Sequence, residues 1–220
     1  MLVPHFEPVR LVSKWTLPSD PMTDQSRPGR KRSEQSRLAI LAATLELVAE
    51  AGYGTLTIEG IAARSGVGKQ TIYRWWPSKA DVLLDALATK ADLQIPVPDE
   101  GSFRANLARF LGSTFELGGK SPVADTLRAL MAQAQIDPEF GNRFREDFLF
   151  RRRDALGTLV DRARERGELP AGVRPGTVLD VVFGTLWYRL LATREPVDGG
   201  LADELVALLA DHGASTAEIR

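Results

Sequence analysis

The fold is decided by one short stretch of the chain, residues 57–76, which reads TIEGIAARSGVGKQTIYRWW. Thr57 is a favourable N-cap for a first short helix, and Gly66 suits a left-handed turn because it has no Cβ. A second short helix is expected from Lys69 to Trp76. The apolar side chains that close a small core between the two helices are Ile58, Ile61, Ala62, Val67, Ile72 and Trp76. This pattern predicts a helix-turn-helix, whose second helix enters the major groove of DNA.

The side chains outside that small core are suited to contact DNA. The N-terminal turn of a recognition helix reaches the base edges, where lysine can donate to guanine and glutamine can pair with adenine. The residues expected to read bases are Lys69, Gln70 and Thr71. Those expected to hold phosphates are Thr57, Tyr73, Arg74 and Lys79. Trp75 leaves two interpretations open, because it can pack on the sugar-phosphate backbone or cover the scaffold.

Helical patterns continue on both sides of this stretch. Ser33 is a suitable N-cap for a helix that ends at Gly52, and Ser78 for a helix with Asp81 at its third position. Apolar periodicity and Gly or Pro breaks predict further helices at about 102–118, 121–136, 138–167, 175–193 and 200–212. No window shows the alternation of a half-buried strand. We therefore expect an all-α fold with about nine helices.

Composition argues against several functional classes. The chain of 220 residues has no cysteine and two histidines. It therefore has no thiol for catalysis and too few of the usual ligands for a zinc site. No metal and no cofactor are expected, since residues 66–71 only resemble the end of a phosphate-binding loop: Ala63 stands in the place of its first glycine, and Gln70 follows Lys69 where the loop needs Ser or Thr. No apolar run approaches the length of a membrane helix. We expect a cytoplasmic protein that is not an enzyme, with an all-α carrier or enzyme as a remote alternative.

Charge is distributed unevenly along the chain. Residues 27–80 hold nine basic and four acidic residues, whereas the whole chain carries a net charge of −1. A basic end on an acidic body is typical of a protein that touches a polyanion with one end.

The first 32 residues are rich in proline and predict a disordered arm, with Met1 and Met22 as alternative translation starts. The arm ends in three basic residues that either enter a minor groove or add nonspecific attraction: Arg30, Lys31 and Arg32.

The stretch from Arg37 to Lys79 resembles the N-terminal domain of the tetracycline-repressor (TetR) family. The matching pieces are Arg37, Ile40–Ala43, Gly52-Tyr53, Leu56–Ile58, Ile61-Ala62, Gly66-Val67, Thr71–Tyr73 and Pro77–Lys79. The resemblance implies a homodimer on a palindromic DNA operator, usually as a repressor. It also implies a DNA-binding head, residues 33–78, and a regulatory and dimerisation body, residues 79–220. Gly60 and Gly68 depart from the family pattern, where an acid and a serine are common.

The resemblance further implies a pocket for a small, largely apolar effector within the body. Its expected apolar lining is Leu107, Phe110, Leu127, Met131, Phe144, Phe148 and Trp187, with Asn106, Arg128 and Gln135 as polar contacts. An alternative is a DNA-binding regulator without a small ligand, controlled by its expression or by a protein partner.

Two apolar stripes near the C-terminus predict a dimer interface, in which two helices pair with their copies as a four-helix bundle. The stripe residues are Leu179, Val182, Phe183, Leu186, Leu190, Leu201, Leu205, Leu208 and Leu209. The alternative interpretation is that these stripes close the core of the single chain.

Overall fold

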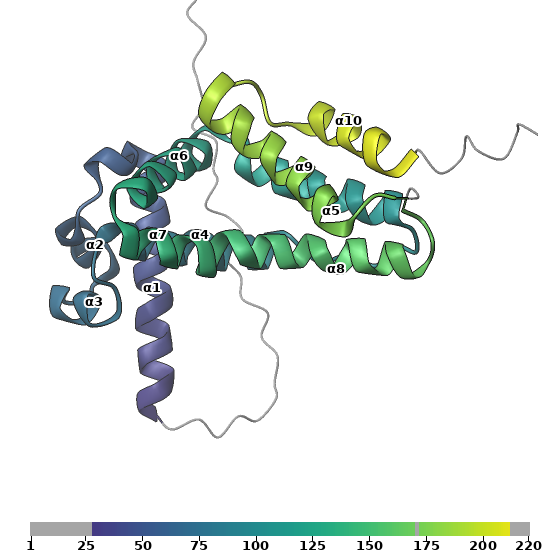
Figure 1. Ribbon diagram of the computed structural model, residues 1–220. Helices are drawn as coiled ribbons and strands as arrows, with labels where there is room; N and C mark the ends of the chain where they lie inside the picture. Colours follow the sequence, from purple (N-terminus) through teal and green to yellow (C-terminus); the bar gives the residue numbers. More distant parts are fainter. Residues whose placement is uncertain (1–27, 170–171, 212–220) are drawn as a thin grey trace, which may run out of the picture.

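Residues 28–169 and 172–211 are described in a computed structural model, and every regular element among them is helical (Figure 1). The elements are α1 (Pro28–Ala51), the 3-10 turn η1 (Tyr53–Thr55), α2 (Ile58–Ser65), α3 (Lys69–Trp75), α4 (Lys79–Gln94), α5 (Phe103–Gly118), α6 (Ser121–Ile136), α7 (Pro138–Phe144), the π-helical η2 (Arg145–Phe150), α8 (Arg151–Glu165), α9 (Pro175–Tyr188), the π-helical η3 (Arg189–Thr193) and α10 (Gly199–Ala210). Since α7–η2–α8 and α9–η3 each run on without a break, the described residues form nine continuous helices. The predicted all-α fold is confirmed. None of these helices combines the length and apolar character that a membrane crossing requires.

The first helix begins earlier than the sequence predicts. It starts at Pro28 and not at Ser33, which lies inside α1. Proline is well suited to a first helical turn, because its φ is already helical and its missing N–H has no partner there. Arg30, Lys31 and Arg32 therefore belong to α1 and not to an arm before it. Their DNA contacts stay a prediction, and the expectations for residues 1–27, Met22 included, lie outside the described residues.

Side-chain caps place most of the later helix starts. Ser102 accepts a hydrogen bond from the backbone N of Ala105 at the start of α5, at 3.3 Å. Asp137 and Asp198 cap α7 and α10 in the same way. An N-cap of this kind contributes roughly 0.5–2 kcal/mol to stability, so local sequence sets these boundaries.

The helices form two ends of one continuous structure. At one end α1 packs against α2 and α4, with α3 beside α2 (Figure 1). At the other end α5 packs against α8 and α10, and α8 against α9. A single hydrophobic core, from Ile40 in α1 to Val206 in α10, runs through both ends. Helix α4 lies between them and touches elements of each.

Candidate DNA interface and ligand cavity

Helices α2 and α3 form the helix-turn-helix that the sequence predicts. Thr57 caps α2, since its hydroxyl oxygen accepts a hydrogen bond from the backbone N of Gly60 at 3.0 Å. Gly66 ends α2 with a φ of 70°, in the left-handed region that favours glycine. Ile61 on α2 and Ile72 on α3 are fully buried, and such burial fixes the orientation of α3.

The N-terminal turn of α3 presents the predicted base-reading residues to solvent. Lys69 and Gln70 are exposed, and Thr71 is half-buried. The ammonium of Lys69 donates to Oε1 of Glu59 at 3.0 Å, and this bond raises the pKa of Lys69 and lowers that of Glu59. Because an exposed ion pair is weak, Lys69 can exchange Glu59 for an acceptor on DNA. The DNA contacts of these residues, and of Thr57, stay a prediction.

The next turn of α3 clarifies the place of Trp75. Tyr73 and Arg74 are exposed, whereas Trp75 is half-buried and packs against the hydrophobic core. Its ring meets that of Trp76 edge-on, with the centroids 5.4 Å apart. The guanidinium of Arg74 lies 5.5 Å from the Trp75 centroid. Of the two interpretations, cover for the scaffold accounts for the buried part of Trp75, which also supports Arg74.

Lys79 has a structural role that sequence reasoning missed. Its ammonium donates to the carbonyl oxygens of Leu56 at 2.8 Å and Tyr53 at 3.4 Å, and lies 4.7 Å from the Tyr53 ring centroid. These contacts fasten the first residue of α4 to the segment between α1 and α2. The contact of Lys79 with a DNA phosphate stays a prediction. An ammonium has three N–H donors, so one of them is left for a phosphate when the other two bond to the carbonyls.

Two aspartates of α4, Asp85 and Asp81, anchor this helix to its neighbours. Oδ1 of Asp85 accepts from Arg37 of α1 at 2.6 Å, and its Oδ2 accepts from the indole nitrogen of Trp76 at 3.1 Å. One carboxylate therefore holds α4 against both the first helix and the end of the recognition helix. Sequence reasoning missed this role, because Asp85 lies 48 residues from Arg37 in the chain.

The second aspartate is Asp81, one turn earlier on α4. It accepts from the hydroxyl of Ser78 at 2.7 Å and from Nε of Arg143 on α7 at 2.6 Å. Burial of Asp81 between these partners links the start of α4 to the body.

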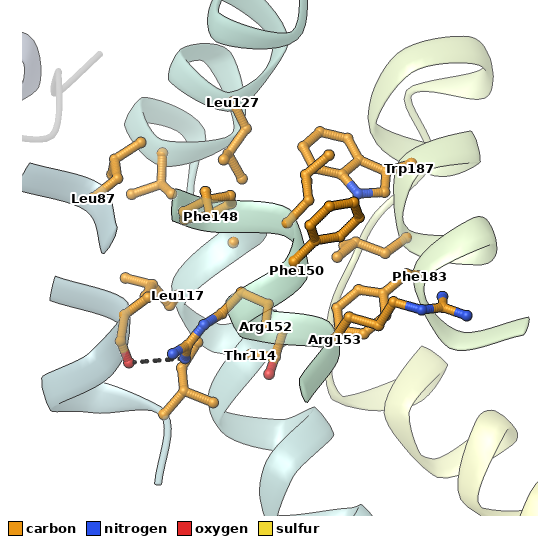
Figure 2. Close-up of a pocket in the computed structure, with 16 residues that line it drawn as sticks. Leu87, Thr114, Leu117, Leu127, Phe148, Phe150, Arg152, Arg153, Phe183 and Trp187 are labelled. Carbon is orange, nitrogen blue, oxygen red and sulfur yellow. Dashed lines mark hydrogen bonds between the residues drawn. The ribbon is translucent and has the colours of Figure 1, made fainter. Parts of the chain in front are cut away.

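The body contains an apolar cavity of about 250 Å³, here called the inner cavity (Figure 2). Its lining residues come from α4, α5, α6, the η2–α8 helix and α9: Leu87, Ala91, Ile95, Thr114, Leu117, Gly118, Val123, Leu127, Phe148, Leu149, Phe150, Arg152, Arg153, Phe183, Leu186 and Trp187. The rings of Phe150, Phe183 and Trp187 gather on one side of it in Figure 2, and Phe148 lies nearer Leu87 and Leu127. Pockets of this kind suit a largely apolar ligand.

Of the predicted lining residues, three line the inner cavity: Leu127, Phe148 and Trp187. Seven do not, which corrects the sequence-based set. Four of these are fully buried in the core, because packing on neighbouring helices fills their side of α5 and α7: Asn106, Leu107, Phe110 and Phe144. The other three lie away from the cavity on α6, where Arg128 bonds to the backbone of Leu190 and Gln135 is exposed beside Met131.

A widened helical turn carries two lining residues that the sequence did not predict, Leu149 and Phe150, beside the predicted Phe148. Phe148, Leu149 and Phe150 are consecutive, yet all three line the cavity. In an α-helix they would point about 100° apart, but they belong to the π-helical segment η2, whose wider turn changes these directions. Just beyond it, Arg152 donates to the carbonyl of Ala91 at 3.3 Å (Figure 2). Burial lowers the pKa of Arg152.

The predicted dimer stripes mostly close the core of the single chain, as the alternative interpretation held. Five of the nine residues are buried within the protomer: Val182, Leu186, Leu190, Leu201 and Leu205. Leu179, Phe183 and Leu209 are half-buried against the same core, and Leu208 is exposed. A stripe pattern shows that a face is apolar but not what covers it. The exposed apolar residues in this region are Tyr188, Leu191 and Leu208.

Comparison with known families and proteins agrees with this architecture. Residues 40–86 match the family of bacterial regulatory proteins of the tetR type, and residues 97–209 match a tetracyclin repressor-like C-terminal domain. The HTH-type transcriptional regulator YdeS of Bacillus subtilis is 33% identical over 189 residues, which cover 83% of this chain and 91% of the relative.

Solved structures show the same fold. The TetR family transcription regulator SCO0332 superposes with a TM-score of 0.70 at 32% identity, covering 79% of this chain and 95% of that one. The regulator FadR of Bacillus subtilis, solved in complex with stearoyl-CoA, has a TM-score of 0.61 at 21% identity, covering 79% and 97% of the two chains. These matches extend over both the helix-turn-helix and the body. The chain therefore belongs to the TetR family of DNA-binding, helix-turn-helix transcriptional regulators.

Proposed function

We propose that this regulator is a repressor that binds a palindromic operator as a homodimer and leaves it when a small, largely apolar effector enters the inner cavity. The head (residues 33–78) would carry the DNA contacts, and the body (residues 79–220) the effector and the dimer partner. In this mechanism the two recognition helices of the free dimer meet successive major grooves, roughly 34–36 Å apart. The effector would favour a different spacing and so lower the affinity for the operator.

The observation that carries this proposal is the position of α4. Its second half supplies Leu87 and Ala91 to the inner cavity, and Ile95 directly after it also lines the cavity. Its first half holds the head through Asp85, which bonds to both Arg37 and Trp76. A helix of 16 residues spans about 24 Å, so a tilt imposed at the cavity reaches the recognition helix without an intervening flexible segment.

The character of the cavity supports an apolar effector. Aromatic and aliphatic side chains make up nearly all of its wall, and they would gain from covering apolar ligand surface. The structural relative FadR, which shares this fold, binds stearoyl-CoA, a molecule with a long apolar chain.

For the dimer, the exposed apolar residues of the last helices offer a new face. Tyr188, Leu191 and Leu208 are 62%, 42% and 54% exposed, although each is large and apolar. Pairing α9–η3 and α10 with their copies would bury these side chains in a four-helix bundle.

The test begins with selection of operator duplexes from a random pool by the full-length protein, followed by a screen of apolar compounds for release of the selected operator. Gly118 lines the inner cavity, and a Cβ added there meets no atom within 4 Å. Gly118→Leu should therefore occupy the cavity while the operator affinity is retained. Gly112→Leu, a matched change on the same helix outside the cavity, should respond to the effector as the wild type does.

Three results would count against the proposal. Undetectable binding to any duplex at low salt contradicts the role of the head. Unchanged release in Gly118→Leu contradicts the inner cavity as the effector site. If no compound releases the wild type, the regulator without a small ligand becomes the better description.

A further inference from the structure

A second cavity, of about 410 Å³, lies where the first helix meets the body, and is here called the junction cavity. Its walls come from α1, α4, α5 and α6, including the turn before α6: Leu45, Val48, Ala49, Leu83, Leu87, Lys90, Gln94, Ser113, Glu116, Leu117, Lys120, Pro122, Val123 and Thr126. The residues at its rim, among them Gln94, Lys120 and Pro122, are exposed, so a ligand can enter from solvent. Charged and hydrogen-bonding side chains make up more of its wall than of the wall of the inner cavity, where Thr114, Arg152 and Arg153 are the polar lining residues.

Lys90 is the unusual group in this wall. It is half-buried, and within the described part of the chain it forms no ion pair and no hydrogen bond. Burial lowers its pKa, and the neighbouring charge of Lys120 acts in the same direction. Lys120 itself pairs with Glu116 at 3.1 Å, which leaves Lys90 as a cation without a counterion. A half-buried charge of this kind is stabilised when an anion reaches it.

The two cavities adjoin each other. Leu87, Leu117 and Val123 line both of them, so these side chains belong to the partition between the two spaces. The inner cavity, at about 250 Å³, is slightly smaller than the roughly 300–1,000 Å³ of most ligand pockets. The two spaces together fall well inside that range. A ligand that extends through both would meet an apolar wall at one end and Lys90 at the other.

We propose that the two cavities form one bipartite site for an amphipathic anion, with the apolar part in the inner cavity and a carboxylate or phosphate on the ammonium of Lys90. This inference rests on the proposed function, since it names the chemistry of the effector for the same site. A cationic headgroup would meet Lys90 and Lys120 as like charges, and a neutral one would leave Lys90 without its counterion.

The junction cavity also gives the anion a direct route to the DNA-binding end of the molecule. Val48 and Ala49 of α1 and Lys90 of α4 belong to the same wall. An anion on Lys90 would therefore lie where α1 meets α4, whereas a molecule confined to the inner cavity would touch no residue of α1.

The test measures binding of four matched probes to the full-length protein by calorimetry: decanoate, decyl phosphate, decanol and decyltrimethylammonium. One charged hydrogen bond contributes about 1.5–3 kcal/mol, so both anions should bind the wild type at least about tenfold more tightly than decanol. The cation should bind more weakly than decanol. A further gain for decyl phosphate over decanoate identifies phosphate as the preferred headgroup, and equal affinities identify the negative charge itself.

Variants assign the effect to one side chain. Lys90→Met should abolish the preference for anions and leave the affinity for decanol unchanged, whereas Lys90→Arg should keep the preference. Arg109→Met, which removes an exposed charge of α5 outside both cavities, is the matched control and should behave as the wild type.

The two proposals fail in different ways. Equal binding of decanol and decanoate to the wild type, or an anion preference that survives in Lys90→Met, overturns the anionic site and leaves the inner cavity as an effector site. Absence of binding for all four probes overturns both.

Discussion

Arg143 on α7 donates from Nε to Oδ1 of Asp81 on α4 at 2.6 Å, across 62 residues of sequence. Asp81 is only 5% exposed, so this carboxylate depends on its few partners. The pair connects the helix that holds the recognition helix to the helix whose continuation forms a wall of the inner cavity. It is therefore a second link, beside α4 itself, between the two ends of the molecule.

Removal of the arginine should destabilise the protein. Arg143→Met leaves Asp81 with the hydroxyl and cap of Ser78, and we expect the free energy of unfolding to fall by roughly 1–3 kcal/mol. Urea denaturation measures this change. Arg145→Met is the control, because Arg145 is exposed and its hydrogen bond to Asn142 stays within one helical turn. Equal losses of unfolding free energy in the two variants would show that the buried pair of Arg143 and Asp81 contributes no more than an exposed arginine.

Two glycines allow the effect of close packing to be measured separately from the effect of helix propensity. Gly112 lies within α5, and Gly119 follows it directly. A Cβ on Gly119 would lie 1.9 Å from the carbonyl oxygen of Val197, whereas one on Gly112 meets nothing within 4 Å. Gly119→Ala should lower the thermal midpoint strongly, since backbone must move. Gly112→Ala should raise stability by roughly 0.5–1 kcal/mol, as alanine favours a helix interior. A neutral Gly119→Ala would mean that the segment around Val197 is not held against α5.

Lys79 should affect stability as well as DNA binding. Lys79→Met removes its hydrogen bonds to the carbonyls of Leu56 and Tyr53, and we expect a loss of about 1–2 kcal/mol in the free energy of unfolding. If Lys79 also holds a phosphate, the affinity for all duplexes should fall alike and the salt dependence should flatten. Unchanged stability together with weaker DNA binding would reduce its role to the phosphate contact.

Gln70 and Tyr73 should behave differently on DNA. Gln70→Ala should change the operator preference at one base position, at a cost of about 1–3 kcal/mol there. Tyr73→Phe should weaken all duplexes without a change in preference, as expected for a phosphate contact. Selection from random duplexes with each variant measures both effects. An unchanged preference profile for Gln70→Ala would assign this side chain to the scaffold.

An acid-sensitive contact joins α1 to α2. Arg64 donates to both oxygens of Glu50, at 2.8 and 2.7 Å, and this bonding lowers the pKa of Glu50. As the pH falls, Glu50 takes up its proton in the unfolded chain before it does so in the folded protein. The contact therefore stabilises the fold fully above the ordinary glutamate pKa of about 4.3, and this stabilisation is lost as the pH falls through the lowered pKa of the folded state.

Glu50→Gln should therefore lower the thermal midpoint at neutral pH, and the difference from the wild type should shrink below about pH 4. Glu165→Gln, which removes an exposed carboxylate without an ion pair in the described part of the chain, is the control. A difference that grows on acidification would contradict the assigned direction.

Local rules explain what could be predicted. The cap at Thr57 and the left-handed turn at Gly66 depend on residues within one helical turn, and both were confirmed. The predicted start of α1 is wrong, because proline content alone predicts disorder for the first 32 residues, whereas Pro28 suits a helix start.

Long-range contacts explain most of what could not be predicted. The acceptors of Lys79 lie 23 and 26 residues earlier in the chain, and nothing in the local pattern points to them. For Leu205 and Leu208 the apolar stripe was correctly recognised, but the first is buried in the protomer and the second is exposed. Periodicity in a single sequence identifies an apolar face, but the element that covers this face is decided by tertiary packing.

The widened turn at Arg145–Phe150 has a consequence for divergence among relatives. A π-helical turn holds about one residue more than an α-helical turn, so loss of one codon here would restore ordinary helix geometry. The side chains beyond the deletion would keep their faces, because the widened turn already accommodates the extra residue. Arg152 would keep its place beside the carbonyl of Ala91, whereas the part of the inner cavity wall that Phe148, Leu149 and Phe150 supply would be rebuilt. A single-residue gap in an alignment at this point would therefore mark a relative in which this part of the cavity wall differs.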